Sequence, residues 1–189
     1  IAFEADVEIL FLHVRSGPAV ARNAGADKAT GDIILFLDAD VVIPSDLIER
    51  FQLIFNADRN TVAVQTVYSP YCPSKDIVTR YQNFYYFYAF NRIKEFSVAT
   101  FATWCAAVKR KIFTEIGGFN TSIPDPTVED EELGYEIADR GRKISLAKDI
   151  QVIHLASYTM TEFINRRSRM ARAQAKSGWR SIRKRMIKR

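Results

Sequence analysis

Runs of apolar residues alternate with amphipathic stretches along the chain, a pattern that predicts an α/β protein. Residues 7–14 (VEILFLHV) and 33–37 (IILFL) are mostly apolar and are typical of buried β-strands. Between them, a helix is expected from Gly17 to about residue 29, with Pro18 in its first turn. A strand, a helix and a strand in succession form a βαβ unit with a right-handed crossover. Residues 33–37 are therefore expected at the centre of a parallel sheet, buried on both faces.

The later elements follow from the same kind of periodicity. A helix beginning near Pro44 has a buried face at i, i+1, i+4, i+7 and i+8, formed by Leu47, Ile48, Phe51, Ile54 and Phe55. Further strands are expected at 61–67, 101–108, 143–146 and 150–154, and further helices at 76–96, 110–116, 128–140 and from 161 onward, with an interruption near Gly178. The 76–96 helix holds too many aromatic side chains for one stripe. Either it is buried on two sides, or part of it lines an acceptor groove or faces a membrane or another partner.

Length and composition fit one core-forming domain followed by a short appendage. Because the chain has 189 residues and 48% hydrophobic content, we assign residues 1–160 to an α/β domain and residues 161–189 to a basic amphipathic helical segment. Cys72 and Cys105 form neither a metal-ligand spacing nor a disulfide framework, which favours a reducing compartment. The sequence has no bilayer-spanning apolar run and no signal-peptide pattern, so a cytoplasmic location is expected. Since the first residue is Ile1 and not methionine, the sequence is interpreted as the inner part of a longer protein.

The net charge of +5 is unevenly distributed. Residues 166–189 hold 11 of the 27 lysines and arginines and no acidic residue, whereas the rest of the chain has 16 basic and 22 acidic residues. In this tail, Trp179, Ile182 and Met186 form a narrow apolar stripe, which suits a helix lying on the anionic inner face of a membrane. The alternatives are a solvated terminal helix or the start of a further C-terminal region. Nucleic-acid binding is disfavoured because the body is acidic and no recognition motif accompanies the tail.

Two clusters of carboxylates carry the candidate chemistry. In the first, Asp38 and Asp40 follow the 33–37 strand, and an extended backbone at Ala39 would project both side chains to one side. Open α/β sheets bind their ligands at the ends of parallel strands, and unpaired carboxylates there need a cation or hydrogen-bond donors nearby. The alternative is that these aspartates cap the next turn or helix.

The second cluster, residues 129–132, lies in the first turn of a predicted helix, where acidic side chains also favour the helix dipole. Asp130 shares a face with the small and apolar residues of this helix, so its side chain is expected to point inward. An inward carboxylate at a helix tip beside the ligand end of a sheet is a candidate general base. The acidic residues expected largely on the opposite face are Glu129, Glu132, Glu136 and Asp139.

Five short motifs in order resemble those of the family 2 glycosyltransferases. The family's patterns are G-x-A-x-A-R-N-x-G, A-x-G-D, D-x-D, I-G-G-F and E-D-x-D-L. The matching segments are 17–25 (GPAVARNAG), 29–32 (ATGD), 36–40 (FLDAD), 116–119 (IGGF) and 129–133 (EDEEL), in which Glu132 replaces the second aspartate. The ordered set extends from Gly17 to about Arg169 and so covers most of the chain.

The resemblance implies a GT-A fold over residues 1–160, with a mostly parallel, Rossmann-like central sheet flanked by helices, and a basic C-terminal helix after it. It implies an inverting, metal-dependent transfer of a sugar from a UDP-, GDP- or dTDP-sugar to a hydroxyl of a glycan or lipid-linked acceptor. On this basis Asp38 contacts the ribose or uracil side of the nucleotide, and Asp40 coordinates Mn²⁺ or Mg²⁺ on the donor pyrophosphate. Asp130 resembles the family's catalytic base. His154 ends a strand where the family often has a histidine near the metal, although a structural histidine is the alternative.

The resemblance also assigns residues around the two substrates. The additional donor-side residues are Arg22, Asn23, Ala39 and Arg169. The acceptor-side residues are Thr103, Trp104, Cys105 and Glu129. Trp104 either stacks on a sugar ring or packs in the core.

The chain departs from the family pattern in two places. The family's first strand, which reads the nucleobase, normally precedes the position where this sequence begins. Processive members carry Q-x-x-R-W after the base, whereas this chain has only Arg166-x-x-Arg169-Met170, which argues against a polymer-forming synthase. Two rival functions are a nucleotidyltransferase, whose usual glycine-rich phosphate loop is not seen, and a catalytically incomplete domain that binds an anionic membrane or partner through its tail.

Overall fold

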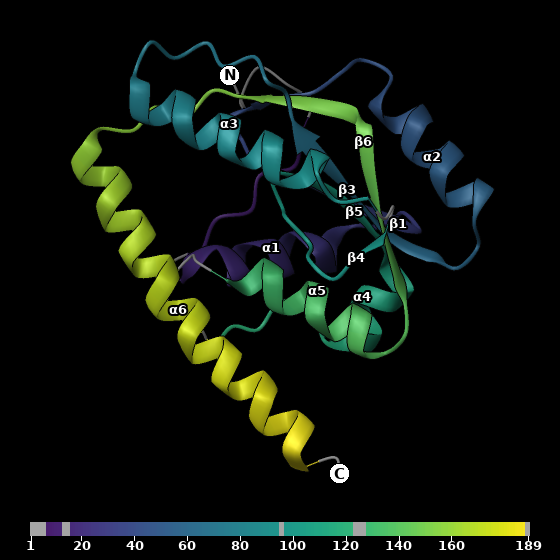
Figure 1. Cartoon of the computed structure of the whole chain (residues 1–189). Helices are drawn as coiled ribbons and strands as arrows, with labels where there is room; N and C mark the ends of the chain where they lie inside the picture. Colours follow the sequence, from purple (N-terminus) through teal and green to yellow (C-terminus); the bar gives the residue numbers. More distant parts are fainter. Residues whose placement is uncertain (1–6, 13–15, 95–96, 123–127, 188–189) are drawn as a thin grey trace.

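The structure, a computed structural model, describes residues 7–12, 16–94, 97–122 and 128–187, with only the backbone described for 176–187. The helices and strands in chain order are α1 (Gly17–Lys28), β1 (Ile33–Leu37), β2 (Val41–Val42), α2 (Leu47–Ala57), β3 (Thr61–Tyr68), α3 (Ile77–Asn91), β4 (Ser97–Val98), β5 (Cys105–Lys109), α4 (Arg110–Ile116), α5 (Glu129–Asp139), β6 (Lys143–His154) and α6 (Met160–Ile187). Figure 1 shows a central sheet with helices on both faces, which confirms the predicted α/β class.

The sheet is mixed, and its strand order is β1-β5-β3-β6-β2, with β4 pairing with β6. The central pair, β3 and β6, is parallel, while β5 runs antiparallel to both β1 and β3. Every residue of β3 is buried, because this strand has neighbours on both edges and helices on both faces. The β-branched sequence of β3 suits such a position.

Two apolar clusters fill the space on the two sides of the sheet. Helices α1, α4 and α5 cover one side, where Phe36 of β1 packs against Phe113 and Phe119. Helix α2 covers the other side through Leu47, Phe51 and Phe55, and Tyr86 of α3 packs against the same cluster. The buried positions of α2 thus match much of the predicted apolar face, although Ile48 is exposed.

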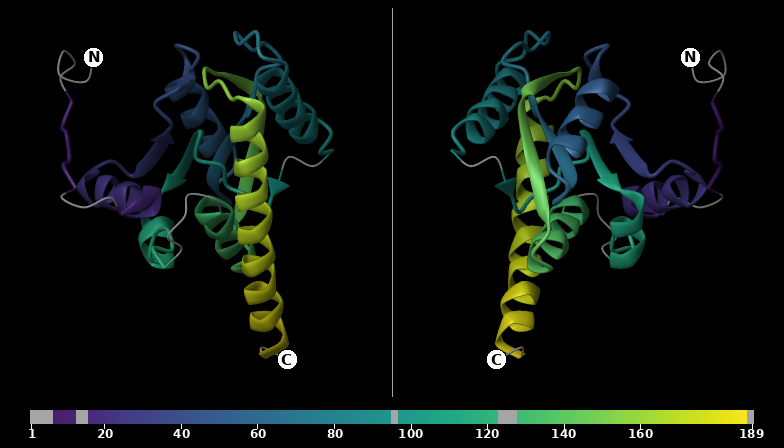
Figure 2. Two further views of the ribbon diagram at one scale, coloured as in Figure 1. Left: turned by 90° about the vertical axis from the view of Figure 1, so that its left-hand side faces the viewer. Right: turned by 90° about the vertical axis from the view of Figure 1, so that its right-hand side faces the viewer.

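The predicted position of the 33–37 strand is wrong. It forms β1, but β1 lies at an edge of the sheet among the described residues and pairs antiparallel with β5. Residues 7–12 form no strand and run outside the sheet (Figure 2), so the expected βαβ unit is not formed there, and residues 13–14 lie outside the described part. One edge of β1 therefore has no strand beside it in the described residues, and Ile33 and Leu37 are partly exposed. An apolar run predicts a strand but does not determine how many of its edges are paired.

Four other elements differ clearly from their predicted bounds. Strand β5 begins at Cys105 and not at residue 101, so Thr103 and Trp104 lie before the strand. Helix α3 ends at Asn91, short of the predicted 96, and one of its faces is exposed, so burial on two sides is wrong. Strand β6 joins the two strands predicted at 143–146 and 150–154, with a register shift against β3 between them. Helix α6 continues through Gly178 without an interruption. In the described part of the chain, no helix is long and apolar enough to cross a membrane.

Candidate active site

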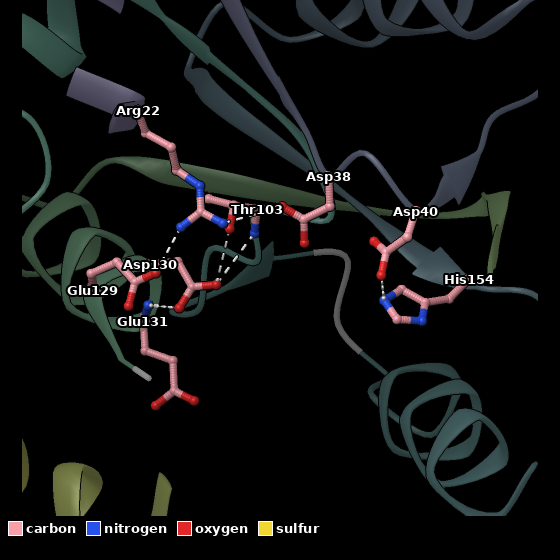
Figure 3. A network of polar contacts seen from close by, with 8 residues as sticks. All are labelled: Arg22, Asp38, Asp40, Thr103, Glu129, Asp130, Glu131 and His154. Carbon is pink, nitrogen blue, oxygen red and sulfur yellow. Dashed lines mark hydrogen bonds and ion pairs between the residues drawn. The ribbon is translucent and has the colours of Figure 1, made fainter. Parts of the chain in front are cut away.

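A pocket of about 210 Å³ opens where the ends of several elements meet. It is lined by Asp38 after β1, Trp104 before β5, His154 at the end of β6 and Asp130 in the first turn of α5. The end of β1 lies beside the start of β5 because the two strands are antiparallel, with Leu37 opposite Cys105, and Thr103 before β5 is hydrogen-bonded to Asp130 of α5. The topology thus brings both predicted acidic clusters to one end of the sheet (Figure 3).

Arg22 of α1 connects the two acidic clusters. Its Nη2 atom lies 3.1 Å from Oδ1 of Asp38, and its Nη1 atom donates to Oε1 of Glu129 at 2.6 Å. The turn carrying Asp38 is also attached to the next segment, because the Asp38 amide donates to the Trp104 carbonyl at 3.1 Å. Arg22 therefore fixes α1, α5 and the end of β1 relative to one another.

The orientation predicted for Glu129 is wrong. Its side chain is buried and not on the outer face of α5, with a relative side-chain exposure of 6%. The guanidinium of Arg22 supplies the charge that makes this burial tolerable, since a buried carboxylate without a partner is costly. Helical spacing gives the direction of the Cα–Cβ bond only. The longer side chain of a glutamate in the first turn of a helix can still bend toward a nearby cation, here Arg22.

Asp130 is held at the pocket wall by three hydrogen bonds. The backbone amide and the hydroxyl of Thr103 donate to its Oδ2 at 3.3 and 3.4 Å, and the Glu131 amide donates to its Oδ1 at 2.8 Å. Burial, together with the nearby charge of Glu129, raises the pKa of Asp130 to about 7, although the hydrogen bonds and Arg22 act in the opposite direction. At neutral pH the carboxylate and the acid are then both populated, as proton transfer requires.

Gly134 allows α5 to lie close to the segment before β5. A Cβ atom at this position would lie 2.5 Å from the amide nitrogen of Phe101 and 2.8 Å from the carbonyl oxygen of Ala99. Because Gly134 is one turn after Asp130, this close packing also sets the position of the carboxylate relative to Thr103.

His154, which lines the pocket, forms a second pair with Asp40, which lies beside it. The antiparallel register of β2 and β6 places Val41 opposite His154, and the Leu155 amide donates to the Asp40 carbonyl at 2.7 Å. As a result, Oδ2 of Asp40 lies 3.6 Å from Nε2 of His154. Burial lowers the pKa of His154 despite the neighbouring carboxylate, which favours the neutral imidazole.

This pair suits one side of a divalent-metal site. A carboxylate oxygen and a neutral imidazole nitrogen are both ligands that Mn²⁺ accepts. Within the described ranges, no three His, Cys, Asp or Glu side chains are grouped closely enough to hold an ion by themselves. The residues present therefore fit a metal whose remaining ligands are phosphate or water oxygens, as is usual for Mg²⁺ at a nucleotide.

Trp104 belongs to an aromatic wall of the pocket. Its ring lies 4.6 Å from Tyr68, 5.8 Å from Tyr86 and 5.5 Å from Phe90, as centroid distances. The indole Nε1 is buried and has no hydrogen-bond partner among the described residues. Trp104 is therefore packed among aromatic side chains and also lines the pocket. Its position is compatible with both predicted roles, packing in the core and stacking on a sugar ring.

Five sequence-predicted site residues do not line the pocket. One is Asp40, which lies just outside the lining beside His154. Asn23 exchanges two hydrogen bonds of 2.9 Å with the backbone of Phe119 and so fastens α1 to the turn after α4. Cys105 is fully buried in β5, where burial raises the pKa of its thiol to about 11. Ala39 and Arg169 are exposed outside the pocket lining.

Arg166 lines the pocket in place of the predicted Arg169. Its Nη1 atom donates to the hydroxyl of Tyr158 at 2.7 Å. Both arginines occur in the motif 166–170, and the three-residue spacing gave no basis for choosing between them. The orientation of α6 about its own axis determines which arginine faces the pocket. That orientation depends on packing against α3, where Phe163 contacts Tyr81.

The fold and the pocket together define a class of protein, the GT-A glycosyltransferases, in which a mixed α/β sheet presents acidic residues at one end. In a family comparison, the model of glycosyl transferase family 2 matches residues 1–117, and the chain belongs to this family. An uncharacterized glycosyltransferase of Haemophilus influenzae is 41% identical over 63 residues, which span 33% of this chain and 25% of that protein.

Two solved structures have a similar fold. The first is the mannosyltransferase PcManGT from Pyrobaculum calidifontis in complex with GDP-Man and Mn²⁺, with a TM-score of 0.59 and 23% identity over 78% of this chain and 39% of that chain. The second is GalNAc-T7 with UDP, GalNAc and Mn²⁺, with a TM-score of 0.60 and 16% identity over 83% of this chain and 33% of that chain. The chain therefore spans well under half the length of each of these relatives.

Proposed function

We propose that this chain forms the catalytic part of an inverting glycosyltransferase that moves a sugar from a nucleotide-diphosphate donor to an acceptor hydroxyl. The observation that carries the proposal is the placement of Asp130. Its carboxylate lines the pocket, is oriented by Thr103 and has a pKa of about 7. A base with a pKa near the working pH is suited to removing a proton from an alcohol.

In the proposed step, the acceptor hydroxyl oxygen attacks the anomeric carbon of the donor while its proton passes to a carboxylate oxygen of Asp130. The new bond joins the acceptor oxygen to the sugar, and the bond from the sugar to the nucleotide diphosphate breaks. The electron pair of that bond leaves with the diphosphate. Attack and departure on opposite faces of the anomeric carbon give inversion.

The donor is assigned to the side of the pocket formed by Asp38, Asp40 and His154. The comparison structures were obtained with GDP-Man or UDP and with Mn²⁺, which supports a nucleotide sugar and a divalent metal here. Asp40 and His154 would hold Mn²⁺ or Mg²⁺, and the metal would neutralise charge on the leaving diphosphate. Asp38 would bind the nucleotide, and Arg166 is close enough to the pocket to meet the diphosphate.

The acceptor is assigned to the side formed by Thr103, Trp104 and Asp130. An aromatic wall beside a base suits a sugar ring, whose apolar face packs on aromatic side chains. A glycan or a lipid-linked acceptor fits this arrangement. The basic tail, whose stripe of Trp179, Ile182 and Met186 lies where side chains are not described, is proposed to assist a lipid-linked acceptor by binding an anionic membrane.

The test separates binding from chemistry by means of Asp130→Asn. This variant should bind a nucleotide-diphosphate sugar with Mn²⁺ as the wild type does, but transfer should fall by about 10²–10⁴-fold, the range of general-base catalysis. Asp139→Asn, which changes an exposed carboxylate at the other end of α5, is the matched control and should keep full activity.

The pH profile provides a second measurement of the same proposal. Because the base must be ionised, transfer should rise with pH and level off above about 7, following the raised pKa of Asp130. Transfer by Asp130→Asn at the wild-type rate would show that another group is the base. Loss of donor binding in this variant would show that the carboxylate holds the substrate instead.

A further inference from the structure

Helix α3 presents an aromatic face that is largely exposed in the described part of the chain. Its exposed side chains follow one stripe of the helix, at i, i+4, i+7, i+8 and i+11, and are Ile77, Tyr81, Phe84, Tyr85 and Tyr88. Three of them, Tyr81, Phe84 and Tyr88, have relative exposures of 59%, 57% and 53%. A contiguous exposed patch of this kind marks an interaction surface, because apolar area in contact with water is unfavourable.

The other side of α3 explains why the helix is placed firmly in the fold. Asn83 donates to the Ser69 carbonyl at 2.8 Å, and Thr79 accepts from the Tyr158 amide at 2.8 Å. Tyr86 and Phe90 contribute to the wall of the pocket. The aromatic face is therefore the outer surface of a helix that also forms the active site, and it is presented on a rigid support.

The beginning of α6 extends this surface. Phe163 packs edge-on against Tyr81 with ring centroids 6.1 Å apart. The guanidinium of Arg167 lies over the rings of Tyr85 and Tyr86, at 5.0 and 5.5 Å from their centroids. Figure 2 shows α6 running past the sheet as one long helix, and its first turns lie next to α3.

The charge of this surface is strongly positive. Residues 75–94 and 160–175 contain eight lysines and arginines against only two acidic residues. Both acidic side chains are engaged locally, since Asp76 accepts from Ser74 and Ser157 and Glu162 accepts from Thr159. Arg92 adds a cation next to the stripe, with its guanidinium 5.3 Å from the centroid of Tyr88.

We infer that the aromatic face of α3, together with the first turns of α6, docks on an anionic phospholipid bilayer. Tyrosine and phenylalanine are suited to the boundary between headgroups and acyl chains, because their rings are apolar and the tyrosine hydroxyl stays hydrated. The surrounding arginines and lysines are attracted to anionic headgroups.

Docking in this orientation keeps the pocket next to the bilayer, because α3 and α6 both line it. If the proposed function is correct, the acceptor hydroxyl would then belong to a lipid-linked molecule that stays in the membrane. The docking surface itself does not depend on that function, since its aromatic stripe lies outside the pocket lining.

The experiment measures co-sedimentation of the full chain with phosphatidylcholine vesicles prepared with and without phosphatidylglycerol. The wild type should bind the anionic vesicles, more weakly as salt is added, and should bind the neutral vesicles poorly. The triple variant Tyr81→Ser/Phe84→Ser/Tyr88→Ser should bind the anionic vesicles on the order of tenfold more weakly, because the apolar contacts are lost. The matched control Ile48→Ser/Leu53→Ser removes exposed apolar side chains from α2 and should bind as the wild type does.

A second variant tests the surface without altering its aromatic rings. Arg80→Glu/Arg92→Glu reverses two charges beside the stripe and should weaken binding to anionic vesicles while circular dichroism and thermal unfolding stay unchanged. Donor hydrolysis or transfer to a water-soluble acceptor, measured without vesicles, should be the same for all these variants. If the wild type shows no such activity, the proposed function is wrong. If the wild type is active but does not bind anionic vesicles, the docking surface is wrong and the proposed function is not affected.

Three results would overturn the inference. One is that the wild type does not bind anionic vesicles. Another is that the triple variant binds as tightly as the wild type while charge removal within residues 180–189 abolishes binding, since the tail would then be the anchor. The third is that light scattering shows the wild type to self-associate, while the triple variant is monomeric and binds vesicles as the wild type does. The aromatic face would then be an interface between two copies of the chain.

Discussion

Two regions of the site are built in different ways: the base side, named for the proposed base Asp130, and the metal side, named for the proposed metal ligands Asp40 and His154. On the base side, Arg22, Glu129 and Asp130 are linked to one another or to Thr103 by short polar contacts, and Glu129 is almost fully buried. On the metal side, Asp40 has a relative side-chain exposure of 48%, and its carboxylate has a single contact of 3.6 Å with His154 among the described residues. The base side has a fixed geometry before any ligand binds, whereas the metal side leaves room for ligand oxygens.

This difference follows from the elements that carry the residues. The base side is formed by two helices packed against the sheet and connected by Arg22, so its side chains are surrounded by protein. The metal side is formed by the turn between β1 and the two-residue strand β2, which is held only by its pairing with the end of β6. Substitutions on the base side should therefore affect stability and activity, whereas those on the metal side should affect ligand binding alone.

Arg22→Met should cause the largest loss of stability. The substitution removes the cation of the ion pair with the buried Glu129, and breaking such a pair costs about 3 kcal/mol. Unfolding in urea, followed by circular dichroism, measures this loss. The double variant Arg22→Met/Glu129→Gln should recover at least half of it, because the buried negative charge is removed together with its cation. A single variant as stable as the wild type would show that Arg22 does not support the base side.

Asp40→Ala should leave stability unchanged but weaken metal-dependent nucleotide binding by about 100-fold or more, since loss of even an outer-shell partner costs about 10–100-fold in metal affinity. Calorimetric titration of a nucleoside diphosphate with and without Mn²⁺ measures this effect. Asp27→Ala, an exposed carboxylate on α1, is the matched control. Equal Mn²⁺-dependent affinity in Asp40→Ala and the wild type would exclude Asp40 as a metal ligand.

Gly134→Ala should destabilise the protein by about 1–3 kcal/mol, because the added methyl group has no room against the backbone of residues 99–101. Transfer should fall as well, since a displaced α5 moves Asp130 away from Thr103. Gly25→Ala is a suitable control, because a Cβ at Gly25 meets nothing within 4 Å. That control should be slightly stabilising, as alanine is favoured over glycine inside a helix. Thermal unfolding compares the two variants directly.

A pH dependence of stability is also expected on the base side. The pKa of Asp130 is raised from its ordinary value of 3.8 to about 7 in the folded chain, so the folded state holds a proton that the unfolded state has released. The contribution of this group is fully present below pH 3.8 and is lost as pH rises through about 7. Asp130→Asn should therefore be more stable than the wild type at pH 8 by about 1–3 kcal/mol. A stability difference that does not vary between pH 5 and 8 would contradict the raised pKa.

The sequence predicted the positions of Asp38 and Asp130 in the pocket lining better than it predicted the pairing of β1 in the sheet. The motif around Asp38 and the inward position of Asp130 could be read from local patterns, because a helix tip and a strand end have fixed spacings. The partners of these residues could not be read in the same way. Glu129 turned out to be buried because Arg22, more than a hundred residues earlier, supplies a cation, and no local periodicity contains that information.

The aromatic helix α3 illustrates the same limit. Its composition suggested burial on two sides, but the structure buries one side, lines the pocket with another and leaves the stripe from Ile77 to Tyr88 exposed. The number of aromatic residues indicates how much apolar surface the helix has. It does not indicate which part of that surface packs against the rest of the fold. That part is determined by the placement of the sheet and of α6.

By itself, the sequence determined the family, the α/β class and the positions of most helices and strands, because these depend on short motifs and on periodicity within single elements. Only the tertiary structure decided that β1 pairs antiparallel with β5, that Arg166 and not Arg169 lines the pocket, and that Asp40 lies beside His154. The physical reason is that register, helix rotation and burial depend on contacts between residues far apart in the chain. The burial that results from this packing also raises the pKa of Asp130.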